Sequence, residues 1–137
     1  MFKTAGGKYI APQAIETKLM ESTLIAQIMV VGENRKFPSA LIVPAFEEIE
    51  KWMKHKGIPV VSKEETIKNP KVIEKYNQEV DRLSTEFGHW EKIKKFILLS
   101  KEWTIDEGQL TPKLSLKRKI ILKENEEKIE KIYQENS

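Results

Sequence analysis

The chain has 137 residues, a length typical of one domain, of which 39% are hydrophobic and 33% are charged. Its 24 basic and 21 acidic residues are interspersed and include only three arginines, which argues against a nucleic-acid-binding domain, because such domains usually carry a segregated, arginine-rich face. The absence of cysteine excludes disulfides and thiolate metal sites, and no apolar run reaches the roughly 18 residues of a membrane span, so we expect a soluble, cytoplasmic domain.

The first part of the chain predicts an extended segment, one helix and a β-hairpin. Phe2–Ile10 reads as extended and is broken by Gly6-Gly7. A short helix is expected over residues 12–22, because a proline occupies its first turn, where a missing N–H costs nothing. The β-branched runs Thr23–Gly32 and Phe37–Ala45 flank a polar loop and predict two antiparallel strands.

The middle of the chain predicts two helices separated by a connector. Phe46–His55 has a helical apolar pattern and is followed by a glycine stop signal. Ile58–Lys68 reads as a connector with room for one turn of helix. The clearest helix begins with Asn69 as N-cap and Pro70 in the first position, and its apolar residues recur at helical spacing as far as Phe87.

The last part predicts a strand, a loop and a closing helix. Lys94–Ser100 reads as the strand, Glu102–Pro112 as a loop or loose hairpin, and Ser115 to about Gln134 as one amphipathic helix. The element order β-α-β-β-α-α-β-α contains no βαβ repeat and no internal duplication. It predicts a single α+β domain over residues 1–137, in which helices pack against a small, mostly antiparallel sheet.

Most common catalytic and nucleotide-binding patterns are missing. The two histidines, His55 and His89, lie far apart in the sequence, and without cysteine or a paired-histidine motif no metal site is predicted. Neither a Gly-x-x-x-x-Gly-Lys-Ser/Thr phosphate loop nor a Gly-x-Gly-x-x-Gly turn is present. The residues alone therefore indicate no nucleotide pocket.

Two stretches remain as candidates for a functional role. Thr4–Lys8 (TAGGK) has paired glycines, which form either an ordinary turn or a place where a ligand approaches the backbone closely. Gln109–Lys123 places basic residues at the start of the predicted closing helix, where each opposes the helix dipole at a cost of about 0.3–1 kcal/mol. Such lysines either form a solvated face or place a point charge on a phosphate or carboxylate.

Taken together and in this order, the two stretches resemble a known enzyme family. FKTAGGKYIAPQAIE (Phe2–Glu16) closely resembles the hinge-proximal motif of the AMP-forming acyl-CoA synthetases, in their long-chain fatty acid–CoA ligase branch. GQLTPKLSLKRKII, from Gly108, resembles the C-terminal lysine motif of that branch, and the hairpin ending in ALIVP also matches it. The resemblance extends from Phe2 to the final helix.

The resemblance implies that the chain is the mobile C-terminal domain of such a ligase, an enzyme of fatty acid and lipid metabolism. The full enzyme would convert a fatty acid, ATP and coenzyme A into acyl-CoA, AMP and pyrophosphate. ATP, the acyl chain and Mg²⁺ would be held by a large N-terminal domain that is absent from this sequence, so Met1 is expected to mark a truncation and the isolated domain is expected to be inactive. The large domain is the implied partner.

The family motifs also imply roles for particular residues. Lys117, followed by an arginine, matches the lysine that stabilises charge during adenylation. Lys113 is the alternative, since it stands where relatives usually have threonine. Gly6 and Gly7 match the loop that forms one wall of the coenzyme A channel, and Lys8 either neutralises a phosphate or is a solvated lysine.

A second hypothesis is a stand-alone interaction or regulatory module derived from such a domain, which would dock onto a separate large subunit. Retention of both Gly6-Gly7 and Lys117 favours the ligase, because an interaction module would have little use for them. Pro12 and Glu16 also match the motif and are interpreted as structural, as a helix start and as the acceptor of a fixing hydrogen bond. Peripheral membrane contact is left open.

Overall fold

The computed structural model describes residues 1–134 and divides the chain into two compact units, Met1–Ser100 and Lys101–Ser137. Each unit is described by itself. The first holds the three-stranded sheet and its helices, and the second holds the lysine-rich segment. No helix within the described residues is long and apolar enough to cross a membrane.

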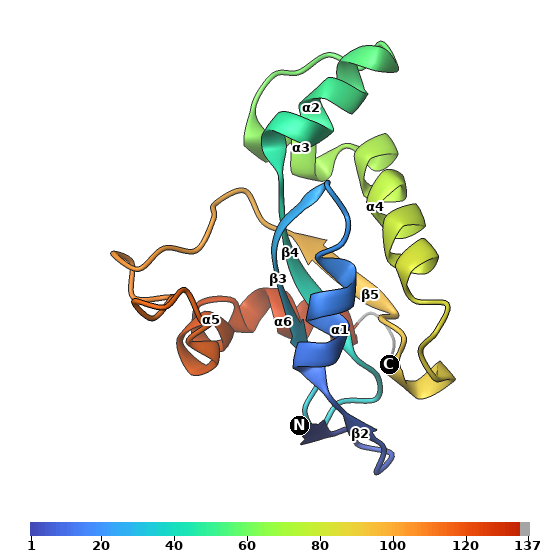
Figure 1. The fold of residues 1–137 in the computed structure, drawn as a ribbon, viewed down its shortest axis with the longest axis vertical. Coiled ribbons are helices and arrows are strands. Elements are labelled where there is room, and N and C mark those ends of the chain that lie inside the picture. Colours follow the sequence, from blue (N-terminus) through green and yellow to red (C-terminus); the bar gives the residue numbers. More distant parts are fainter. Residues whose placement is uncertain (135–137) are drawn as a thin grey trace. The chain divides into compact units, whose positions relative to one another are not determined.

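The main sheet of the first unit has three strands in the order β3-β4-β5 (Figure 1). β3 (Ile25–Val31) and β4 (Ser39–Pro44) pair antiparallel, which confirms the predicted hairpin. β5 (Lys95–Leu98) confirms the third strand but pairs parallel with β4. The central strand is buried along its whole length, which explains its continuous apolar run.

Four α-helices belong to this unit: α1 (Pro12–Leu19), α2 (Phe46–His55), α3 (Lys63–Lys68) and α4 (Pro70–Leu83). The predicted cap of α4 is present, because Asn69 Oδ1 accepts from the main-chain N–H groups of the first turn at 2.8 and 3.4 Å. α4 ends earlier than predicted. The Ser84 hydroxyl donates to the Val80 carbonyl, and the N–H of Phe87 then bonds back to Ser84 in a turn.

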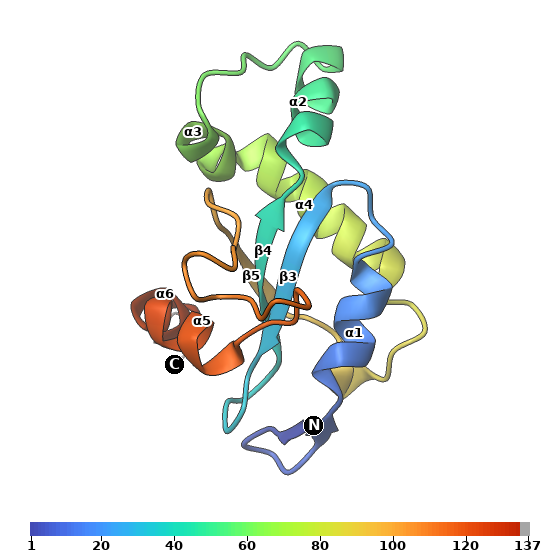
Figure 2. The ribbon, with the colours of Figure 1, turned by 60° about the vertical axis from the view of Figure 1, so that its left-hand side comes forward.

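One layer of helices covers one face of the sheet, as the predicted packing requires. Figure 2 shows α1 and α4 side by side along the strands. Tyr76 is fully buried between these elements, and its hydroxyl donates to the Leu24 carbonyl at 2.7 Å. Burial raises the pKa of Tyr76, and the nearby Glu79 carboxylate raises it further by a smaller amount. The hydroxyl therefore keeps its proton and remains a donor.

Glu79 links α4 to the end of α1. Its carboxylate accepts from the Ser22 hydroxyl at 2.6 Å and from the Arg82 guanidinium at 3.0 and 3.2 Å. The hydrogen bond from Arg82 lowers the pKa of Glu79 most, and the bond from Ser22 lowers it further, while partial burial acts in the opposite direction. Ionised Glu79 therefore stabilises the folded chain.

We expect Glu79→Gln to lower the free energy of unfolding by about 1 kcal/mol at neutral pH. Because the folded pKa lies below the ordinary value of 4.5, this advantage of the wild type is fully present above 4.5 and is lost as pH falls below it. Urea unfolding of both proteins between neutral pH and acid measures the difference. A difference that stays constant as pH falls would contradict the linkage.

The segment before α1 forms a hairpin of its own. β1 (Phe2–Lys3) and β2 (Tyr9–Ile10) pair antiparallel, so the predicted extended segment is folded back at its glycines. The loop that joins β3 to β4 holds this hairpin through two main-chain bonds, from Ala5 N–H to the Arg35 carbonyl at 2.7 Å and from Asn34 N–H to the Lys3 carbonyl at 2.9 Å.

The second unit differs from its prediction in one respect. A loose hairpin is present, closed by an isolated bridge between Leu110 and Leu116. The single closing helix predicted from Ser115 is wrong, because α5 (Arg118–Glu124) and α6 (Glu126–Gln134) are separate helices. Asn125 interrupts them. Its side-chain amide and its main-chain N–H both donate to the Ile121 carbonyl, at 2.8 and 3.1 Å, and such a local side-chain bond disfavours a regular helix.

Candidate functional site

The glycine loop, residues 4–8, is a tight turn between β1 and β2 that is held by hydrogen bonds within the loop and by the bond from Ala5 N–H to the Arg35 carbonyl. The N–H of Thr4 donates to the Lys8 carbonyl at 2.9 Å, and the N–H of Lys8 donates to the Thr4 hydroxyl at 3.2 Å. Thr4 is buried, whereas the residues from Ala5 to Lys8 are exposed. The loop is thus anchored at its base and open to solvent at its tip.

The two glycines of this loop are not equivalent. Gly7 has φ +84°, a left-handed conformation that side chains rarely adopt, so the turn itself requires glycine there. Gly6 has no such φ, and a Cβ atom built on it would meet nothing within 4 Å. The fold of the described chain therefore gives no reason for glycine at position 6.

The Lys8 side chain contacts an aromatic ring from a distant segment of the same unit. Its Nζ lies 5.4 Å from the centroid of the Trp90 ring, within the range of a cation–π interaction. Trp90 belongs to the short 3₁₀ helix η1 (His89–Glu91) before β5. The sequence contained no signal for this contact, because no periodicity or motif relates Lys8 to Trp90.

The lysine hairpin, residues 109–117, presents the second set of candidates. Thr111 N–H donates to the Ser115 carbonyl at 2.9 Å, and Lys117 N–H donates to the Gln109 carbonyl at 2.9 Å. Lys117 is also the N-cap residue of α5, and its carbonyl accepts the first bonds of that helix. Its side chain is exposed, and its backbone is held on both sides.

Lys113 occupies a different position, at the tip of the same hairpin. It is exposed, and the next residue, Leu114, has φ +66° and is 66% exposed. A leucine in the left-handed region is strained by roughly 1 kcal/mol. Lys113 and Lys117 therefore share one hairpin but lie at its tip and at its base.

The structure thus gathers the candidates into two groups. Gly6, Gly7 and Lys8 form one loop of the first unit, while Lys113 and Lys117 form one hairpin of the second. Within residues 1–134, no three histidine or carboxylate side chains converge on a point where they could hold a metal ion. The described residues therefore do not provide the ligands that a bound Mg²⁺ ion needs.

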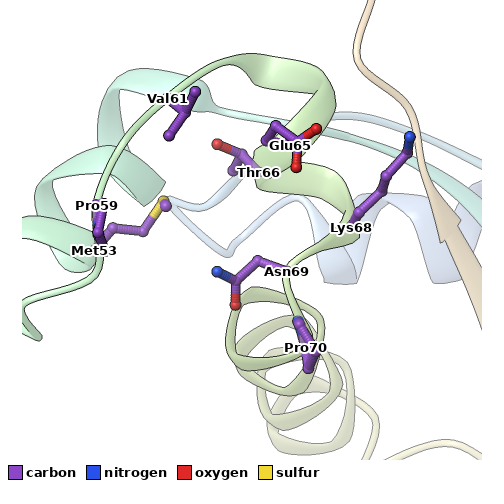
Figure 3. A pocket seen from close by; sticks show the side chains of 8 residues that line it. All are labelled: Met53, Pro59, Val61, Glu65, Thr66, Lys68, Asn69 and Pro70. Atoms are coloured by element: carbon purple, nitrogen blue, oxygen red, sulfur yellow. The ribbon is translucent and has the colours of Figure 1, made fainter.

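A surface pocket of about 380 Å³ lies beside α2, α3 and the start of α4 (Figure 3). Met53, Pro59 and Val61 form its apolar wall, and Glu65 and Lys68 carry its charges. None of the predicted site residues, in the glycine loop or in the lysine-rich segment, lines it. The hydroxyl in its lining, on Thr66, donates to the Ser62 carbonyl at 2.8 Å, so the pocket presents no activated nucleophile.

The model of the AMP-binding enzyme C-terminal domain family matches residues 2–137. Long-chain-fatty-acid–CoA ligase FadD15 of Mycobacterium tuberculosis is 34% identical over 131 residues, which are 95% of this chain and 22% of that protein. Long-chain-fatty-acid–CoA ligase 1 of Homo sapiens is 36% identical over 121 residues, or 86% of this chain and 17% of that protein. The chain therefore spans about a fifth of the length of these curated relatives.

Solved structures have the same fold. The A domain of the carboxylic acid reductase from Segniliparus rugosus, in complex with AMP and a co-purified carboxylic acid, superposes with a TM-score of 0.80 at 21% identity, over 99% of this chain and 20% of that one. Mycobacterium tuberculosis fatty acyl CoA synthetase gives 0.53 at 15% identity, over 87% of this chain and 18% of that one. The predicted α+β fold is confirmed.

Proposed function

The chain belongs to the AMP-binding enzyme C-terminal domain family, and on that premise we propose that it is the mobile catalytic C-terminal domain of a long-chain fatty acid–CoA ligase. One observation carries the proposal. The chain matched to the family has both an open glycine loop and a lysine presented from a rigid hairpin base. An interaction module would need neither of these features.

In the proposed first half-reaction, a fatty acid carboxylate attacks the α-phosphate of ATP, and pyrophosphate leaves. Negative charge grows on the reacting oxygens, and the Lys117 ammonium stabilises it. The large N-terminal domain would hold ATP, so this step needs both domains. The isolated chain would therefore not turn over.

Lys117 is a better candidate than Lys113 for this role on physical grounds. Main-chain hydrogen bonds hold Lys117 on both sides, so its side chain extends from a fixed point. Lys113 projects from a hairpin tip next to a strained residue. Catalytic charge must be positioned accurately to be useful, which favours the base of the hairpin.

In the proposed second half-reaction, the thiol of coenzyme A attacks the acyl-adenylate, and AMP leaves. The glycine loop would form one wall of the channel for the pantetheine arm. Gly6 supports this proposal, because the described fold leaves open space around it and its backbone does not require glycine. A ligand that approaches the loop closely would explain why position 6 is glycine, because a side chain there would block the approach.

Substitutions at the two glycines separate folding from function. We expect Gly7→Ala to lower the free energy of unfolding by about 1 kcal/mol, because its φ of +84° strains an alanine. We expect Gly6→Ala to leave stability within about 0.5 kcal/mol, yet to raise the KM for coenzyme A in an enzyme that contains both domains. A folded Gly6→Ala variant with normal thioester formation would contradict the channel role.

Complementation tests the whole proposal. The chain is mixed with the separately expressed N-terminal part of a relative such as the Mycobacterium tuberculosis ligase, and thioester formation from fatty acid, ATP and coenzyme A is followed. We expect activity from the mixture and none from either part alone. If the two parts bind each other and no thioester forms, the interaction-module hypothesis replaces the ligase.

A further inference from the structure

Packing in the core of the unit does not explain the position of the Trp90 ring. Trp90 is 46% exposed, and it lies outside the cluster of buried core residues. Other aromatic rings of the unit also lie near lysines. Trp52 and Phe46 pack against the core, whereas Tyr9, with Lys3 at 5.5 Å from its centroid, is exposed on the N-terminal hairpin. The conformation of Trp90 therefore needs another explanation.

The Trp90 ring packs directly against the backbone of Gly88. A Cβ atom built on Gly88 would lie 2.7 to 3.0 Å from three atoms of that ring, so only glycine admits the ring in this position. The backbone of Gly88 has φ −62°, which any residue adopts. The need for glycine there comes from the ring alone.

Glu91 fixes the turn that carries the ring. Its carboxylate accepts from the Gly88 N–H at 3.0 Å, while its own N–H donates to the Gly88 carbonyl at 2.9 Å. This pair of bonds closes η1 around Trp90. The ring thus packs on a glycine within a closed turn, and the Lys8 ammonium lies 5.4 Å from its centroid.

Resting on the function proposed above, we propose that Trp90 is a positioning residue that holds the Lys8 ammonium beside the glycine loop, where it meets the phosphate groups of coenzyme A. A free lysine samples many rotamers, and a ligand that binds it must immobilise it. A ring that already restrains the side chain reduces this loss. Gly88 serves the same purpose indirectly, because it makes room for the ring.

The contact is tested first in the chain as it stands, by NMR. Protons on the Lys8 side chain above the Trp90 ring should be shifted upfield by the ring current. We expect Trp90→Phe to retain part of this shift, and Trp90→Leu to remove it. Gly88→Ala should remove it as well, because the backbone accepts alanine while the ring must move. An unshifted Lys8 in the wild-type chain would overturn the proposal.

The consequence is tested in the enzyme that contains both domains. We expect Trp90→Leu and Gly88→Ala to raise the KM for coenzyme A by about threefold, with Trp90→Phe closer to the wild type. Lys8→Met should give the same rise, and adding Trp90→Leu to it should change nothing further. Lys75→Met is the matched control, because it breaks the lysine contact with Trp52, whose ring centroid lies 5.7 Å from Lys75 Nζ.

The outcomes separate this inference from the proposed function. A KM that rises in Lys8→Met but not in Gly88→Ala or Trp90→Leu would overturn the positioning role and leave the ligase intact. Equal effects of Lys75→Met and Lys8→Met would also overturn it. A wild-type mixture without thioester formation would contradict the proposed function, while the NMR measurement still decides whether Trp90 holds Lys8.

Discussion

Replacing Lys117 by alanine is expected to lower the rate of the adenylation half-reaction by about 10²–10³-fold, the loss typical of removing one group that stabilises transition-state charge. The rate is measured as fatty acid-dependent exchange of pyrophosphate into ATP, in the mixture of this chain with the N-terminal part of a relative. Lys113→Ala is expected to stay within about twofold of the wild type, because an exposed charge at a hairpin tip contributes little.

Neither substitution should disturb the fold, since both lysines are exposed and the hairpin is held by main-chain atoms. We expect each variant to unfold within about 0.5 kcal/mol of the wild type, which makes the kinetic comparison a comparison of folded proteins. If Lys113→Ala loses adenylation and Lys117→Ala does not, the catalytic assignment moves to the tip of the hairpin.

Elements marked by local signals were predicted well from the sequence. Asn69 and Pro70 define the start of α4 because a cap and a first-turn proline act within a few residues of the chain. The hairpin of β3 and β4 follows from two apolar runs around a short polar loop. The structure of these segments is decided by neighbours in sequence.

Features decided by distant contacts were not predicted. The composition of β5 shows a strand, but only its pairing with β4 makes it parallel. The break at Asn125 depends on whether its amide prefers the Ile121 carbonyl to solvent, and a polar residue in an otherwise helical pattern does not reveal that choice. The contact of Lys8 with Trp90 joins two segments that no periodicity relates.

The candidate site was predicted unevenly for the same reason. The residue pattern alone left Gly6-Gly7 as an ordinary turn and the lysines as a solvated face, and the resemblance supplied the roles. The structure adds distinctions that neither the residue pattern nor the resemblance could make. It separates Gly7, which the turn requires, from Gly6, which it does not, and it places Lys117 at the base and Lys113 at the tip of one hairpin.

The structural role predicted for Glu16 is confirmed and has a large expected effect. Its carboxylate accepts from the Val30 N–H at 2.7 Å, and both residues are buried, with 8% and 3% of their surfaces exposed. We expect Glu16→Ala to lower the free energy of unfolding by about 2–3 kcal/mol, because it leaves a buried N–H without this charged acceptor. Urea unfolding measures the change.

Two matched variants decide the cause of that loss. Glu16→Gln keeps an acceptor for the Val30 N–H without the charge, so it should cost about half as much. Glu21 lies just beyond the same helix and forms an exposed ion pair with Lys18 at 3.4 Å, and Glu21→Ala should cost less than about 0.5 kcal/mol. If Glu16→Ala is as mild as Glu21→Ala, the bond to Val30 does not hold α1 on the sheet. The N-terminal hairpin, which carries the glycine loop and leads directly into α1, would then depend on its two bonds to the β3–β4 loop for its position.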